Sequence, residues 1–83
     1  MSTHEKLLLK MRNNQKNWQL ANLLAIAERY GVEVRNNGGS HHVFSFPGIP
    51  LKPCVPAHRP IKPVYIKQFL LFINQVLQIR ESV

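Results

Sequence analysis

The clearest pattern in the chain is a helical repeat of apolar side chains across residues 17–31. Apolar residues that recur at i, i+3, i+4 and i+7 lie on one face of an α-helix. The residues with this spacing are Leu20, Leu23, Leu24, Ala27 and Tyr30. Asn17 suits the N-cap position and Gly31 suits the C-terminal cap. We therefore predict an amphipathic helix between these two residues.

Residues 6–12 show the same spacing in a shorter form, with Leu7, Leu8 and Met11 on one face, followed by a polar stretch over residues 13–17. This pattern predicts a short, separable N-terminal helix. A longer helix is expected from Pro63 to about Arg80, because proline suits the first helical position. Its core stripe consists of Ile66, Phe69, Leu70, Ile73 and Leu77.

Further apolar residues widen the face of this last helix to roughly half its circumference. They are Tyr65, Phe72, Val76 and Ile79. This apolar surface is wider than a helix needs when it packs against a sheet on one side only. We expect either the N-terminal helix or a protein partner to cover the excess.

Between the helices the pattern changes to alternation, which is typical of strands. Residues 32–35 form the first predicted strand, residues 36–39 (Asn-Asn-Gly-Gly) a hairpin turn, and residues 40–46 the returning strand. All six prolines fall between positions 47 and 63. Proline lacks the N–H that a central strand needs, so residues 51–55 are expected to form at best an edge strand after a Pro47-Gly48 turn.

The order helix, helix, strand, strand, strand, helix predicts an α+β fold in a single domain, residues 1–83. Its small three-stranded antiparallel sheet has helices packed on one face and an open second face. Along the second strand, His42 shares a face with Phe44 and Phe46, whose bulk favours the helix side. His41 is then expected to face outward.

Composition adds a strong positive charge: 11 Lys and Arg against four Asp and Glu give a net charge of +7. This excess favours a polyanionic partner, with nucleic acid first. No segment approaches the roughly 20 apolar residues that span a bilayer, so we expect no membrane association. The single Cys54 cannot form an intramolecular disulfide, which favours a cytoplasmic protein.

Three histidines are the candidate catalytic residues. An exposed His41 could exchange a proton in a phosphodiester reaction, although a solvated histidine is more often just a surface residue. His42 is expected to be half-buried and satisfied by a backbone group, and is a weaker catalytic candidate. His58 follows the edge strand, where the sheet could bring it near His41, or it is an ordinary loop histidine.

The candidate phosphate-binding residues are basic and lie in the same half of the chain. They either contact the phosphates of RNA or are ordinary solvated surface residues, and the sequence leaves both open. They are Lys52, Arg59, Lys62 and Lys67. Lys52 is expected on the outer face with Cys54. We expect no metal site, because the histidines and Cys54 fit no standard zinc spacing, and no dinucleotide or P-loop motif predicts a cofactor.

The segment Gly39-Ser40-His41-His42-Val43-Phe44 resembles the HicA toxins of HicA/HicB toxin–antitoxin systems, whose hallmark is Gly-Ser-His-x-x-aromatic. Val55-Pro56-Ala57-His58 and the helix over residues 62–77 are also similar, so the resemblance covers residues 20–76. Two features depart from the family: the helix over residues 5–12 precedes the usual start, and Pro53 interrupts the third strand.

This resemblance implies that residues 18–80 form a core similar to double-stranded-RNA-binding domains, with residues 1–17 as an N-terminal helical extension. It also implies a metal-independent endonuclease that cleaves messenger RNA, with His41 as the acid or base and Ser40 in the RNA-binding motif. The implied partner is a HicB-type antitoxin, and homo- or hetero-oligomers stay open. A non-catalytic RNA-binding module is the main alternative, and a DNA- or protein-binding adaptor the third.

Overall fold

Three helices and three strands follow one another in the predicted order α-α-β-β-β-α. The computed structural model describes residues 3–36, 38–57 and 59–81. The elements are α1 (Thr3–Asn13), α2 (Leu20–Arg29), β1 (Glu33–Asn36), β2 (His41–Ser45), β3 (Cys54–Pro56) and α3 (Pro63–Glu81). The α+β class and the order of elements are thus confirmed. No helix in the described ranges is long and apolar enough to cross a membrane.

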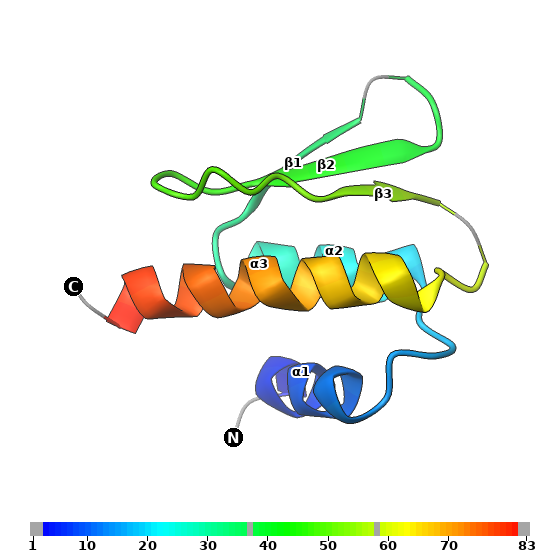
Figure 1. Ribbon diagram of the computed structural model, residues 1–83, viewed down its shortest axis with the longest axis horizontal. Coiled ribbons are helices and arrows are strands. Elements are labelled where there is room, and N and C mark those ends of the chain that lie inside the picture. The colour runs from blue at the N-terminus through cyan, green and yellow to red at the C-terminus, as the bar shows by residue number, and fades with distance from the viewer. Residues whose placement is uncertain (1–2, 37, 58, 82–83) are drawn as a thin grey trace.

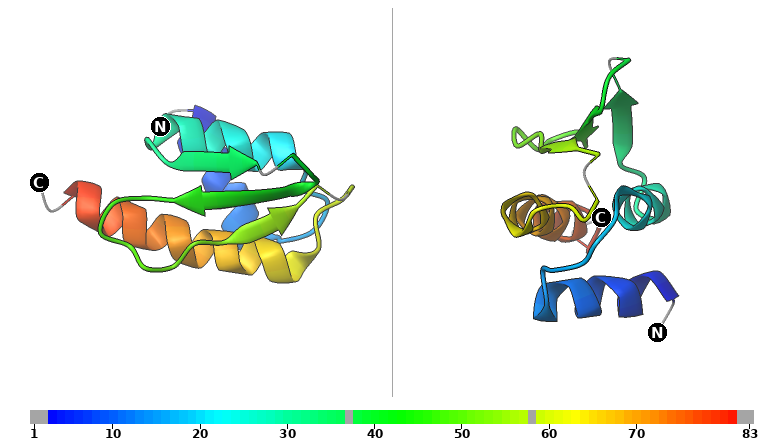
Figure 2. Two further views of the ribbon diagram at one scale, coloured as in Figure 1. Left: turned by 90° about the horizontal axis from the view of Figure 1, so that it is seen from above. Right: turned by 90° about the vertical axis from the view of Figure 1, so that its right-hand side faces the viewer.

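The elements stack in three layers (Figures 1 and 2). The sheet forms the first layer, α2 and α3 lie side by side beneath it, and α1 lies beneath these two helices, on the side away from the sheet. The strand order is β1-β2-β3, with both neighbouring pairs antiparallel. The helices therefore cover one face of the sheet and leave the other face open, as the sequence predicts.

The edge strand β3 is shorter and begins later than the predicted range of residues 51–55. It covers only Cys54–Pro56, which pair with the first three residues of β2. The reason is the proline spacing, because Pro50 and Pro53 have no N–H to donate. Pro53 nevertheless contributes its carbonyl oxygen, which accepts a hydrogen bond from the Phe44 N–H at 2.9 Å.

The helix boundaries agree with the sequence at one end of α2 and differ at the other. Gly31 follows the helix with φ of 73°, the conformation expected of a glycine after the C-cap. Asn17 is not the N-cap: Gln19 holds that position, and its N–H donates to Asn22 Oδ1 at 3.0 Å. Asn17 instead lies in the preceding turn with φ of 64°.

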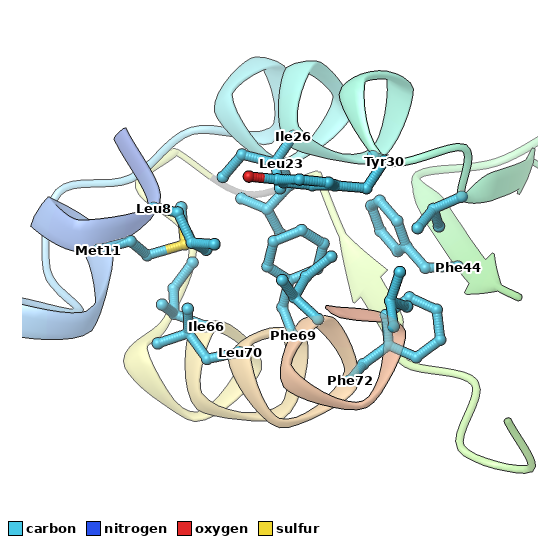
Figure 3. Close-up of a cluster of buried hydrophobic side chains, with 14 of the residues drawn as sticks. Leu8, Met11, Leu23, Ile26, Tyr30, Phe44, Ile66, Phe69, Leu70 and Phe72 are labelled. Atoms are coloured by element: carbon cyan, nitrogen blue, oxygen red, sulfur yellow. The ribbon is translucent and has the colours of Figure 1, made fainter. Parts of the chain in front are cut away.

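The core lies between the sheet and the helices and extends down to α1 (Figure 3). Phe44 of β2 and Phe69 of α3 are fully buried, with ring centroids 5.2 Å apart in an edge-to-face arrangement. Leu8 and Met11 of α1 are also buried and extend toward the α3 side of the cluster. The N-terminal helix therefore covers apolar surface of α3.

The buried residues of α3 correct its predicted core stripe: Phe72 lies toward Phe44 and the sheet, whereas Ile66 and Leu70 lie toward Leu8 and Met11 of α1 (Figure 3). Phe72 and Val76, assigned to the excess arc, are fully buried, whereas Leu77 is only half-buried. A helix packed on two sides buries a wider arc than a helix packed on one. Arg12 of α1 fastens the layer at its rim by donating from Nη2 to Asn74 Oδ1 of α3 at 2.8 Å.

Candidate functional site

The open face of the sheet carries His41. Because side chains alternate along a strand, His41, Val43 and Ser45 share this face, and Phe44 points the opposite way into the core. His41 is exposed, His42 is half-buried and Phe44 has no exposed surface. The predicted outward orientation of His41 is confirmed.

A glycine turn places His41 at the first position of β2. Gly38 has φ of 85°, and its N–H donates to Asn36 Oδ1 at 2.8 Å. On the other side of the strand, the Ala57 N–H donates to the Ser40 carbonyl at 2.7 Å. The backbone before His41 is therefore held by Asn36 of β1 and by Ala57, which directly follows β3, and Ser40 itself is exposed.

Replacing Gly38 with alanine is expected to destabilise this turn. An L-residue in the left-handed region costs about 1 to 2 kcal/mol, which lowers Tm by roughly 4 to 16 °C in a domain of this size. Gly39 is the matched control, because its φ is not positive and an added Cβ meets nothing within 4 Å. Thermal unfolding by circular dichroism should show a clear loss for Gly38→Ala only. Equal Tm values for the two variants would contradict this account of the turn.

His42 has a different partner from the one predicted. Its Nε2 lies 2.8 Å from Asn36 Nδ2, a side-chain contact rather than a backbone one. Because Asn36 Oδ1 already accepts from Gly38, the amide must present its N–H₂ to the ring. Nε2 then accepts, and the proton of the neutral ring lies on Nδ1, which is buried and has no hydrogen-bond partner among the described residues. His42 is thus part of the hairpin framework.

Ring nitrogen chemical shifts of the neutral His42 imidazole, measured by NMR, are expected to show a protonated Nδ1 and an unprotonated Nε2. Replacing Asn36 with alanine should remove this preference, since the donor to Nε2 is lost. A protonated Nε2 in the unmodified protein would mean that the hydrogen bonds around Asn36 are arranged differently.

The predicted basic residues do not form one patch. Lys52 lies just before β3 on the open side of the sheet. Lys62 lines a separate hollow with Lys16, between the α1–α2 connection and the start of α3. Arg59 is exposed in the connection from β3 to α3, and Lys67 is exposed on α3.

The connection that carries Arg59 and Lys62 runs down the same end of the molecule as the β1–β2 hairpin loop (Figures 1 and 2). This is the end at which His41 begins β2, directly after the loop. Two of the predicted cations are thus brought to the histidine end of the fold. His58, the candidate partner of His41, lies outside the described residues.

An open hollow of about 870 Å³ occupies the face that carries His41; we call it the sheet hollow. It is lined by residues 46–50 and by Glu33, Arg35, Val43, Ser45 and Lys52. Arg35 was missed in the sequence analysis, although the alternation of residues 32–35 already places it opposite the buried Val32. For the loop over residues 46–50 the sequence predicts a turn, but nothing in it indicates that the loop lines a hollow.

Among the residues in the described ranges, no three His, Cys, Asp or Glu side chains are grouped so that they could hold a metal ion. Cys54 is exposed and pairs with Val43 across the two strands. The site therefore consists of an accessible imidazole, separated cations and the sheet hollow.

Comparison of the chain with models of protein families, with curated proteins and with solved structures gives no match.

Proposed function

We propose that this protein is an RNA endonuclease toxin of the HicA type, with His41 as its catalytic residue. The observation that carries the proposal is the exposure of the motif histidine on the uncovered face of the sheet. A polymer substrate can reach an imidazole there without entering a closed cavity. The succession α2-β1-β2-β3-α3, with both helices on one face, supports a core over residues 18–80 similar to double-stranded-RNA-binding domains.

The proposed reaction uses the ribose of the substrate as nucleophile. The 2′-oxygen attacks the adjacent phosphorus, and the bond from phosphorus to the 5′-oxygen of the next nucleotide breaks. His41 acts as the base that takes the 2′-hydroxyl proton or as the acid that protonates the leaving 5′-oxygen. The products end in a 2′,3′-cyclic phosphate and a 5′-hydroxyl. Only RNA has the required hydroxyl, so DNA is not a substrate.

The charge of the chain suits this substrate. A net charge of +7 attracts a polyanion over long range, and cations beside the scissile phosphate stabilise the negative charge that develops on its oxygens. As a toxin, the protein would act on messenger RNA in the cytoplasm. A HicB-type antitoxin would inhibit it by covering the face that carries His41.

A non-catalytic RNA-binding module is the second candidate. One observation favours it: the residue opposite His41 on β3 is Pro56, which has no group that could exchange a proton. An acid–base reaction usually needs a second group to complete the proton transfers. In this alternative, His41 contacts RNA without cleaving it.

The test is to incubate the purified protein with a single-stranded oligoribonucleotide in the presence of EDTA. The toxin proposal expects cleavage with cyclic phosphate ends. A matched oligonucleotide with 2′-deoxy sugars throughout should stay intact. Binding of the oligoribonucleotide without any cleavage would favour the non-catalytic module.

A further inference from the structure

We propose that the sheet hollow is a binding subsite for a nucleotide of single-stranded RNA, next to the nucleotide that reacts at His41. Arg35 and Lys52 bind its phosphate, and the apolar part of the lining, at Val43 and the loop over residues 46–50, seats its base. The inference rests on the proposed function, because it gives the substrate a position on the same face. It adds that the protein binds the nucleotide next to the reacting one, and that it binds the RNA as a single strand.

The sheet hollow has the size and the mixed lining of a ligand site. Its volume of about 870 Å³ falls within the range of about 300 to 1,000 Å³ that is common for such sites. One side is the open face of β1 and β2, and the other is the loop over residues 46–50. A nucleotide has a matching character, since its base has apolar faces and its phosphate is an anion.

The loop that closes the sheet hollow is anchored to the core. Ile49 is 5% exposed, and its N–H donates to the Phe46 carbonyl at 3.1 Å. Gly48 has φ of 88°, and a Cβ at this position would lie 3.4 Å from Ile79 Cδ1 of α3. A loop fastened in this way to α3 keeps the hollow formed in the absence of ligand, which lowers the ordering cost of binding.

The charges at the sheet hollow favour an anion. Arg35 and Lys52 contribute two cations from its two sides, against one carboxylate, Glu33. Glu33 Oε1 accepts a hydrogen bond from Arg35 Nε at 3.0 Å. This contact uses one donor of the guanidinium, so the Nη donors can bind a phosphate. The pair is well exposed, so it is weak and yields readily to a phosphate.

The position of the sheet hollow relative to His41 fits adjacent nucleotides. Val43 lines the hollow and lies two residues after His41 on the same face, a distance of about 6.6 Å along a strand. An extended nucleic acid strand spans such a distance with one nucleotide. Single strands bind to open basic surfaces with their bases exposed, whereas the bases of a duplex are stacked inside and cannot reach the apolar lining of the hollow.

Binding should be measured by fluorescence anisotropy in a His41→Ala background, so that the RNA stays intact. The double variant Arg35→Ala/Lys52→Ala is expected to raise Kd for a single-stranded oligoribonucleotide about tenfold. It should also reduce the slope of log K against log salt by about 0.7, the value for one phosphate that is no longer neutralised on a single strand. The matched control is Lys6→Ala/Lys10→Ala, which removes the same charge from α1, in the layer farthest from the sheet.

A second variant, Ser45→Trp, fills the sheet hollow and leaves both cations in place. It is expected to weaken binding of the single strand and to leave binding of a duplex of the same sequence unchanged. Equal losses of affinity for the two charge variants would overturn the subsite. Single-strand binding that the Arg35, Lys52 and Ser45 substitutions leave unchanged would overturn it as well. Failure of the proposed function is distinguishable, because the unmodified protein would then not cleave the RNA, whereas failure of the subsite would leave its cleavage unchanged and appear only as variants that bind as well as the control.

Discussion

Replacement of His41 by alanine is expected to reduce RNA cleavage by about two to four orders of magnitude, the usual contribution of a general acid or base. The loss should appear in the rate of the chemical step, since an exposed side chain at the start of β2 contributes little to packing. Single-turnover cleavage of a labelled oligoribonucleotide in EDTA measures this rate. Thermal unfolding of the same variant should match that of the unmodified protein.

His4→Ala is the matched control for this substitution. It also removes one imidazole, but from α1, in the layer on the far side of α2 and α3 from the sheet. Its cleavage rate should equal that of the unmodified protein. Added imidazole is expected to restore part of the activity of His41→Ala, because a free imidazole can reach an open face. Equal cleavage by His41→Ala and the unmodified protein would remove His41 from the catalytic role.

The fold was predictable to the extent that local pattern determines it. Helix α2 follows from its apolar spacing, and the hairpin follows from the Asn-Asn-Gly-Gly turn. The orientation of His41 required only the alternation along β2 and the bulk of Phe44. These signals lie within a few residues of the features they determine, so no knowledge of the tertiary structure was needed.

The errors have tertiary causes. The N-cap of α2 is Gln19 and not the predicted Asn17. Trp18 lies between these two residues, and its carbonyl oxygen accepts a hydrogen bond from the Ile61 N–H at 2.8 Å. That contact joins the start of α2 to the segment before α3, and nothing near Asn17 in the sequence indicates it. Phe72 is likewise buried because the sheet side of α3, where it lies near Phe44, differs from the predicted stripe, part of which faces α1 at Ile66 and Leu70 (Figure 3). The width of the apolar arc alone does not indicate which part faces the sheet.

The candidate site was predictable only in part, for a related reason. Strand alternation could have identified Arg35, because it places Glu33 and Arg35 on the face opposite to Val32 and Val34, which is the open face of the sheet. The sheet hollow, however, depends on the loop over residues 46–50 folding back to α3, where Gly48 approaches Ile79. The framework role of His42 depends on which way the Asn36 amide points, and this becomes evident only when the Gly38 N–H is placed.

Phe44→Ala is expected to destabilise the protein by about 3 to 5 kcal/mol, the usual cost of deleting a buried phenyl group. The ring is fully buried and contacts Phe69 edge-to-face at 5.2 Å, so the cavity would open between the sheet and α3. Domains of this kind have a total stability of about 5 to 15 kcal/mol, and a small core places this chain toward the lower end. The variant should be largely unfolded or close to it.

Urea denaturation followed by circular dichroism measures this loss, and Phe44→Leu is the control, since it keeps most of the buried volume and should cost clearly less. A loss below about 1 kcal/mol for Phe44→Ala would mean that β2 is not packed on the helices as described. Only two residues separate His41 from Phe44 on one short strand, yet we expect His41→Ala to remove activity without lowering stability. Phe44→Ala should remove stability and, through it, activity. The open face of β2 thus carries the proposed catalytic residue and the other face packs against the helices. Each of the two substitutions tests one of these faces.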